Sequence, residues 1–341
     1  GGGLGVRQPG SAFKPFAYLT AFSKGYFPET VVFDAPTEFV PNNPNCPIIV
    51  DFSNENDQCY HPENFDNYFR GPINLRNALS QSINVPAVKI LYLAGLDNTI
   101  KTAKDFGITT LKDSNFYGLS LVLGGGEVKL IDLINAYSVF SQEGVRHNQK
   151  IVLKIKDAKG KEIESSSDQA VQVFEPQYVK MLNDVLSDPE ARRPLYSGSF
   201  DLTVFDDRQV ALKTGTTNDY RDAWTIGYTP YLVAGVWAGN NNQVPMQKNG
   251  GSILAALPIW NAFMREALLK YPAEPFNKPD EINLAKIQKP MLNGYYTYDI
   301  HDILYYVDKN DPLGPIPQNP SNDPQFINWE TSSQIWWQRS S

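Results

Sequence analysis

The sequence has few of the residues that build metal centres. Its 341 residues include two cysteines and three histidines, and none of the histidines lies in an HExxH or paired-histidine spacing. Two thiols are too few for a four-thiolate zinc site or for a framework of several disulfides. The composition therefore argues against a metalloenzyme and against the small disulfide-rich folds.

The two cysteines, Cys46 and Cys59, lie in one stretch that is rich in Pro and Asn. A disulfide between them would close a short loop and contribute roughly 3 kcal/mol by the loop-entropy relation. Such a bond suits an oxidising compartment. Two unpaired thiols fit the sequence equally well, so both alternatives stay open.

Excess basic charge and long apolar runs are also missing. There are 30 Lys and Arg against 37 Asp and Glu, a net charge of -7. Because the chain has no basic stripe for a phosphate backbone, we expect no nucleic acid partner.

No stretch approaches the roughly 18–20 apolar residues that span a bilayer, and no signal-peptide pattern is present. The chain opens with three glycines that neither cap a helix nor start a strand. We therefore expect it to begin inside a longer protein.

The apolar side chains that are present predict a globular protein with mixed secondary structure. Residues 11–24 carry apolar positions at a helical spacing, and Pro15 fits only the first turn of that helix. This places Ser11 at or just before the helix N-terminus. Residues 30–70 are rich in Pro, Asn and Asp and predict irregular loop. Helical patterns then dominate the next stretch and predict a helical subdomain over about 70–145.

The second half of the chain carries strand patterns. Residues 151–164 alternate with period two and predict a hairpin, and a helix is expected near 176–187. Three strand-like runs follow, QVALKTG, DAWTIGYT and YLVAGVWAG, and then a helix at about 252–270. An antiparallel sheet packed by helices, with a helical subdomain, indicates an α+β fold. The shift to Pro and Asn beyond Pro272 predicts a C-terminal appendage over 273–341, after a main domain of residues 1–272.

Chemistry is suggested first by Ser11 and Lys14. A Ser three positions before a Lys on a helix places hydroxyl and amine on one face, near enough to share a proton. The helix N-terminus at Ser11 also favours an oxyanion that forms nearby. Taken alone, SxxK is a weak signal, since Ser11 has the position and chemistry of an ordinary N-cap.

Two further motifs add to the SxxK spacing. Ser82-Ile83-Asn84 lies where one predicted helix ends and the next begins, a place where both polar residues also suit capping. Lys213-Thr214-Gly215-Thr216-Thr217 lies on a predicted strand, whose period aims Thr214 and Thr216 to one side. Gly215 leaves room there for a close neighbour.

The segments RQPGSAFKPF, ALSQSINVPAV, LVLGGGEVKLIDLINAYSVF and KTGTTNDYRDAWTIGYTP resemble the transpeptidase domain of class A penicillin-binding proteins. SxxK, SxN and KTG occur once each, in that order, and the resemblance covers residues 7 to about 270. It implies the serine β-lactamase/DD-peptidase fold, with a catalytic groove between the sheet and the helical subdomain. It also implies a site without metal or cofactor.

By this resemblance Ser11 is the nucleophile that attacks the penultimate D-Ala carbonyl of a peptidoglycan stem peptide, and also the residue that β-lactam antibiotics acylate. Lys14 is the expected base, which requires a neutral amine and so a pKa well below the usual value of about 10.4. Burial and the charge of Lys213 would supply that shift. Ser82 would relay a proton to the departing amine, and Asn84 would hold Lys14 and the substrate amide.

The same resemblance assigns the remaining site residues. The backbone N–H groups of Ser11 and Thr216 would form the oxyanion hole. The hydroxyls of Thr214 and Thr216 would bind the substrate carboxylate with help from the charge of Lys213. The neighbouring residues of the motif would line the substrate-binding strand; they are Gly215 and Thr217.

Members of this family usually carry a membrane anchor and a glycosyltransferase domain upstream, which are expected of the parent protein rather than of this chain. The substrate implies an extracytoplasmic location, in the periplasm or at the outer face of the cytoplasmic membrane. The charged segment after Leu186 departs from the family pattern and is expected to form a loop near the groove floor.

Two alternatives to the transpeptidase compete. One is a hydrolase on the same fold: a DD-carboxypeptidase, β-lactamase or esterase. No ExxLN segment supplies a deacylating Glu, so we expect a long-lived acyl-enzyme instead. The other is a β-lactam-binding sensor or scaffold without turnover.

Overall fold

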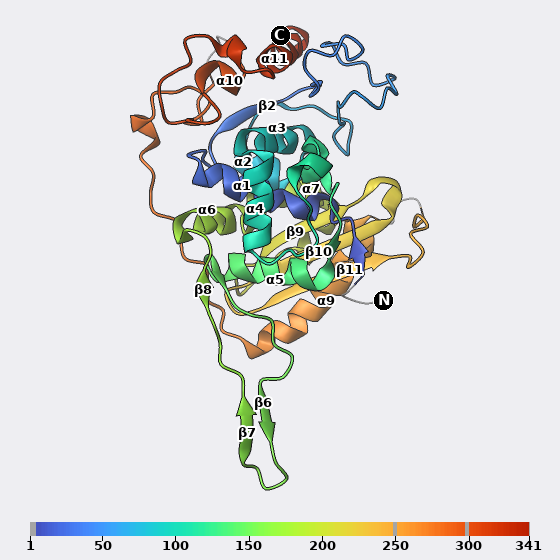
Figure 1. Cartoon of the computed structure of the whole chain (residues 1–341), viewed down its shortest axis with the longest axis vertical. Helices are drawn as coiled ribbons and strands as arrows, with labels where there is room; N and C mark the ends of the chain where they lie inside the picture. Colours follow the sequence, from blue (N-terminus) through green and yellow to red (C-terminus); the bar gives the residue numbers. More distant parts are fainter. Residues whose placement is uncertain (1–4, 248–250, 297–299, 341) are drawn as a thin grey trace.

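A three-stranded antiparallel sheet stands at the centre of the computed structural model, which describes residues 5–247, 251–296 and 300–340 (Figure 1). Its strands are β9 (Ala211–Thr216), β10 (Asp222–Tyr228) and β11 (Val233–Gly239), in the order β11-β10-β9. This confirms the three predicted strands, with β9 at the edge. The opening glycines lie outside the described residues.

Helices cover both faces of this sheet, and alternate side chains enter two different cores. Trp224 and Tyr228 of β10 face the main core, with α5 (Leu130–Ser141) and α6 (Pro176–Leu186). Leu212 and Ala234 face a smaller core under α8 (Ser252–Ala255) and α9 (Leu257–Ala267). Because both faces are covered, every residue of β10 is buried. The edge of β9 is thereby held rigidly against the segment that carries Ser11.

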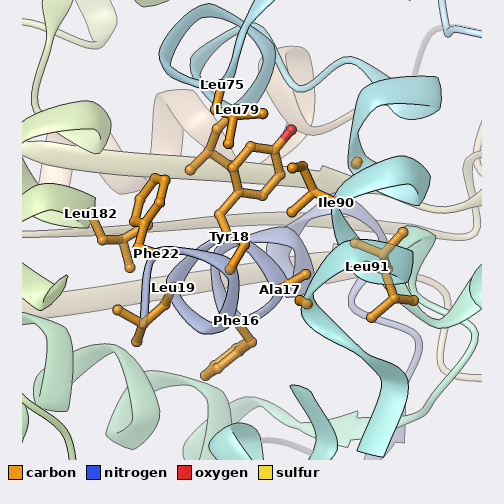
Figure 2. Packing of buried hydrophobic residues seen from close by; sticks show 14 of the residues in the cluster. Phe16, Ala17, Tyr18, Leu19, Phe22, Leu75, Leu79, Ile90, Leu91 and Leu182 are labelled. Carbon is orange, nitrogen blue, oxygen red and sulfur yellow. The ribbon is translucent and has the colours of Figure 1, made fainter. Parts of the chain in front are cut away.

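The main core forms around α1 (Lys14–Ser23), in which all residues except Ser23 are buried. Figure 2 shows its aromatic side chains, among them Tyr18 and Phe22, surrounded by aliphatic residues of three other helices. Those helices are α2 (Leu75–Ser80), α3 (Asn84–Ala94) and α6. A helix buried on all sides has few ways to shift, so α1 is a firm support for a reactive group at its start.

The predicted helical stretch between 72 and 145 is confirmed. After α3 come α4 (Leu96–Asp105), the short 3₁₀ helices η3 (Ser114–Phe116) and η4 (Leu119–Leu123), and α5. A two-residue pairing joins β1 (Val6–Arg7) to β4 (Val128–Lys129), just before α5. This pairing fixes the chain immediately before the SxxK motif.

The predicted hairpin is confirmed as β6 (Lys154–Lys156) and β7 (Glu162–Ser165), and it projects away from the body of the protein (Figure 1). At its base, β5 (Val145–Arg146) pairs with β8 (Val171–Gln172). All residues of β6 and β7 are exposed. The hairpin therefore adds nothing to the core that supports the site.

The predicted appendage, residues 273–341, folds back over the helical part of the protein in its described residues, 273–296 and 300–340 (Figure 1). They contain η8 (Leu284–Lys286), α10 (Ile303–Tyr306), η9 (Pro320–Asn322) and α11 (Phe326–Ser340). Trp329 of α11 is completely buried in the main core. Lys89 of α3 donates to Asp302 at 2.6 Å, and both side chains are fully buried. The C-terminal segment thus braces the helix that starts at Asn84.

Three local predictions need correction. Residues 31–34 were expected in a loop but form β2 (Val31–Asp34), which pairs with β3 (Gly71–Asn74), because their β-branched and aromatic side chains are buried. The segment after Leu186 was expected to be a loop but forms α7 (Pro189–Tyr196) and η5 (Ser197–Leu202). Asp188 caps α7 by accepting from the Ala191 N–H at 3.0 Å. The helix predicted over 252–270 divides into α8, α9 and η7 (Leu268–Lys270).

Cys46 and Cys59 are joined by a disulfide, which settles the alternative that the sequence left open. Within the described residues, no helix is both long enough and apolar enough to cross a membrane.

Candidate active site

Ser11 lies in η2 (Gly10–Phe13), a 3₁₀ turn that runs directly into α1. Pro15 occupies the first turn of α1, as predicted. Gly10 has a φ of +54°, and a Cβ there would lie 2.6 Å from the Thr216 carbonyl oxygen. Only glycine fits this conformation and this spacing. The sequence of the turn therefore brings Ser11 against the end of β9.

Lys14 begins α1 and is fully buried. Its Nζ donates to the Ser82 carbonyl at 2.6 Å, to the Ile83 carbonyl at 3.1 Å and to Asn84 Oδ1 at 2.8 Å. An ammonium group has three N–H donors for these three acceptors, whereas a neutral amine has two donors and one lone pair. Loss of a proton from Lys14 therefore frees one position around Nζ for another donor.

The SxN motif forms the turn between α2 and α3, as expected. Ser82 has a φ of +59°, an unusual conformation for a residue with a side chain. In this conformation its carbonyl accepts from Lys14, while its hydroxyl accepts from Lys213 Nζ at 2.7 Å. Backbone strain that is held in place by two buried amines is typical of a functional site.

The KTG motif lies on the edge strand β9. Lys213 is buried, and its Nζ also donates to the Thr214 carbonyl at 2.8 Å. A Cβ on Gly215 would lie 2.2 Å from the Pro9 carbonyl oxygen, so the expected close neighbour of Gly215 is the chain just before Ser11. Lys14, Ser82 and Lys213 thus meet between α1, the SxN turn and β9, and the backbone on either side of Ser11 lies against the end of β9.

Burial lowers the pKa values of both lysines. Burial, followed by the charge of Lys213, lowers the pKa of Lys14 well below its ordinary value, while Asp34 raises it. Burial lowers the pKa of Lys213 to about 7. A lowered pKa is what a lysine needs to serve as a base next to a hydroxyl nucleophile.

The hydroxyls of the three threonines in the motif already have hydrogen-bond partners within the protein. Thr214 Oγ1 and the Tyr196 hydroxyl lie 2.8 Å apart, and both side chains are buried. Thr216 Oγ1 donates to Ser252 Oγ at 3.0 Å and accepts from the Ser252 N–H at 3.0 Å. Thr217 Oγ1 donates to Asp222 Oδ2 at 3.2 Å. A substrate carboxylate that binds the Thr214 hydroxyl would therefore share this hydroxyl with Tyr196.

Sequence reasoning missed three residues that support the motifs: Tyr196, Ser252 and Asn64. Tyr196 lies on α7, in the segment that was expected to be a loop. Asn64 Oδ1 accepts from the backbone N–H groups of Asn84 and Val85. No local pattern marks these residues, since each acts on a motif that is distant in the sequence. The one signal in the sequence was the helical spacing of apolar and charged residues in 189–196. It predicts the helix α7, but not the contact of Tyr196 with the KTG motif.

The family model of the penicillin binding protein transpeptidase domain matches residues 5–265. The chain belongs to this family. Curated relatives include penicillin-binding protein 1A of Aquifex aeolicus (strain VF5), which is 34% identical over 81% of this chain and 35% of the relative. Penicillin-binding protein 1A of Rickettsia bellii (strain RML369-C) is 29% identical over 93% of this chain and 41% of the relative. The chain spans about a third of the length of the first of these relatives.

Solved structures share the fold. Penicillin-binding protein 1A from Haemophilus influenzae superposes with a TM-score of 0.69 at 22% identity, over 86% of this chain and 47% of that one. PonA1 from Mycobacterium tuberculosis, in complex with penicillin V, superposes with a TM-score of 0.67 at 24% identity, over 82% of this chain and 73% of that one. The predicted family and the predicted α+β fold, an antiparallel sheet packed by helices, are confirmed. The family is one of transpeptidases, a class of enzymes that act by acyl transfer or peptidase chemistry.

Proposed function

We propose that this domain is a serine-type D-Ala-D-Ala transpeptidase that cross-links peptidoglycan stem peptides and is acylated by β-lactams. The observation that carries the proposal is the Ser82 turn held between two buried amines. Lys14 reaches its carbonyl at 2.6 Å and Lys213 reaches its hydroxyl at 2.7 Å. This pattern holds the proposed base, Lys14, and a hydroxyl that can pass on a proton, that of Ser82, in one turn.

In the first half-reaction, Ser11 Oγ attacks the carbonyl carbon of the penultimate D-Ala while its proton moves to the neutral amine of Lys14. The N–H groups of Ser11 and Thr216 hold the oxyanion of the tetrahedral intermediate. The C–N bond to the terminal D-Ala then breaks, and Ser82 passes the proton to the leaving amine. The products are a Ser11 ester and free D-Ala.

In the second half-reaction, an amine on a neighbouring stem peptide attacks the ester carbonyl. Its proton returns through the same groups, the ester bond breaks, and Ser11 regains its hydrogen. The new amide bond is the cross-link. A β-lactam follows the first half-reaction alone, because its opened ring stays attached to the acyl group and does not leave the site.

Substrate binding follows from the edge strand. We assign the terminal carboxylate to Lys213, Thr214 and Thr216, with Gly215 and Thr217 shaping the strand around it. Asn84 Nδ2 donates to the Glu63 carbonyl at 2.8 Å, so its second N–H is the one left for a substrate amide. The substrate places the domain outside the cytoplasm. It would act in the periplasm or at the outer face of the cytoplasmic membrane, in a parent protein with an anchor and a glycosyltransferase domain.

The test combines a fluorescent penicillin, which reports covalent labelling, with a chromogenic cephalosporin, which reports hydrolysis. We expect one label per chain, loss of the label in Ser11→Ala, and negligible hydrolysis. Ser23→Ala removes an exposed hydroxyl at the far end of the same helix and serves as the matched control, with labelling unchanged. Rapid repeated hydrolysis would support a β-lactamase. The absence of any label would support a scaffold and contradict the proposal.

A further inference from the structure

Helix α3 starts without a cap of its own. Its N-cap residue, Ile83, has no side chain that can accept from the first-turn amides. The next residue, Asn84, is already engaged, because its Oδ1 accepts from Lys14 and its Nδ2 donates to Glu63. Orphan N–H groups at a helix start need an acceptor from elsewhere.

Asn64 supplies that acceptor from a different segment. Its Oδ1 accepts from the Asn84 N–H at 3.0 Å and from the Val85 N–H at 3.2 Å. Asn64 is only 2% exposed, so solvent does not compete for these bonds. The backbone that presents Asn84 to Lys14 is therefore held by a side chain that has no place in the SxxK, SxN or KTG motifs.

Asp34 fixes the orientation of the Asn64 amide. Asn64 Nδ2 donates to Asp34 Oδ1 at 2.7 Å and to the Tyr68 carbonyl at 2.8 Å. The other carboxylate oxygen accepts from the Arg70 N–H at 3.0 Å. Burial raises the pKa of Asp34, while the bonds from Asn64 and from the Arg70 N–H favour its ionised form. Both oxygens of the fully buried carboxylate face N–H donors, an arrangement that suits the ionised form. Its presence forces the Asn64 carbonyl oxygen to point toward α3.

The charge of Asp34 also acts on Lys14. It raises the pKa of Lys14, against the lowering by burial and by Lys213. The charged and titratable groups around Asp34 come from three further elements: Arg70 before β3, Lys89 on α3 and Tyr18 on α1. One buried carboxylate thus interacts with two cations, Arg70 and Lys89, and acts on the expected base, Lys14.

We propose that Asp34 and Asn64 are positioning residues of the Ser11 site. Asn64 caps α3 and keeps Asn84 against Lys14, while Asp34 orients Asn64 and places one negative charge beside the paired lysines. Neither touches the substrate. The inference rests on the proposed function, since it assigns these residues to the acylation step of Ser11.

Asn64→Ala tests the positioning role. The first-order rate constant for acylation by a fluorescent penicillin should fall roughly tenfold, the size of one buried hydrogen bond, while the Kd of the initial complex stays unchanged. A capping role without effect on the site would lower the Tm and leave the rate constant of the folded protein at the wild-type value. That second result would overturn the proposal.

Asp34→Asn tests the charge. Without the carboxylate, the pKa of Lys14 falls further, so the acid limb of the acylation rate should move to lower pH. Asp132→Asn is the matched control. The Asp132 carboxylate is also buried and accepts from the Thr109 hydroxyl, in a part of the sequence distant from Asp34. The acid limb of the acylation rate in this variant should match that of the wild type. An unmoved limb in Asp34→Asn, or a move to higher pH, would overturn the inference.

The outcomes separate this inference from the proposed function. If wild-type protein takes no label at all, the proposed function fails and the inference fails with it. If wild type is labelled and the variants behave like the control, only the inference fails. Should Asp34→Asn not fold, as judged by the loss of a cooperative melting transition, Asn64→Ala alone decides by its rate constant.

Discussion

Lys213 donates from Nζ to the hydroxyl of Ser82 at 2.7 Å, across the interface between the edge strand of the sheet and the turn that starts α3. The carbonyl of the same serine accepts from Lys14. Ser82 therefore joins the two buried amines, and besides burial the charge of Lys213 lowers the pKa of Lys14.

The pKa of Lys213, about 7, predicts how acylation depends on pH. The second-order rate constant for penicillin should fall as pH rises through about 7, since the free enzyme then loses the charge that attracts the β-lactam carboxylate. Stopped-flow labelling between pH 5 and 10 measures this. In Lys213→Arg, the second-order rate constant at pH 9 should stay close to its value at pH 6, because a guanidinium group remains charged at both pH values. A wild-type rate that is flat or rising between pH 7 and 9 would contradict the assignment.

Lys213 should also lower the free energy of unfolding at low pH. Its pKa is lowered in the folded state, so the unfolded chain binds the extra proton between about pH 7 and 10, and stability rises with pH over that range. Lys213→Met should therefore raise the free energy of unfolding by about 1–2 kcal/mol at pH 6 and abolish acylation. The gain should shrink toward pH 10. Urea denaturation measures the free energy of unfolding at pH 6 and at pH 10. A Lys213→Met variant that is less stable than wild type at pH 6 would contradict the prediction.

Gly215→Ala should open the site. The added methyl group would lie 2.2 Å from the Pro9 carbonyl oxygen and 2.8 Å from the Ala12 amide nitrogen, both backbone atoms. The strand must then move away from Ser11, and acylation should fall roughly 100-fold, since small misplacements at a reacting centre have effects of this size. Gly198→Ala is the control, because a Cβ there meets nothing within 4 Å. Equal labelling rates in the two variants would show that this contact does not set the geometry.

The buried pair Lys89–Asp302 should hold the C-terminal segment on α3. Lys89→Met leaves the Asp302 carboxylate buried without its cation and should lower the free energy of unfolding by about 3–5 kcal/mol. Adding Asp302→Asn removes the unpaired charge and should restore most of that loss. Thermal melts of the three proteins test this. If the double variant is no more stable than Lys89→Met, burial of an unpaired charge is not the cause.

Local spacing raised the motif residues as candidates, and the resemblance to the family made them specific. Ser11 and Lys14 lie three positions apart, Ser82 and Asn84 lie at one helix junction, and Lys213 lies on a strand, but each pattern alone also suits an ordinary cap or edge strand. The α+β fold and the three strands were predictable from the periodicity of their apolar residues. The roles proposed for these residues come from the family resemblance and remain to be measured.

The supporting residues were not predictable, because their roles depend on contacts between distant segments. Nothing near Asn64 in the sequence shows that it caps α3, and the charge of Asp34 gains its effect only through burial. The helix α7 was missed because its Pro and charged residues are typical of loops, whereas a capping Asp188 and a buried Arg192 stabilise it. Arg192 donates to the carbonyls of Leu186, Thr203 and Val210, bonds that no local pattern predicts.

Whether the hydroxyl of Ser11 forms a lasting ester is tested most directly by the mass of the intact chain after exposure to penicillin. We predict that one whole penicillin is added, that peptide mapping places it on Ser11, and that the adduct persists after the free antibiotic is removed. An unchanged mass, or an adduct on another residue, would contradict the assignment of Ser11 as the nucleophile.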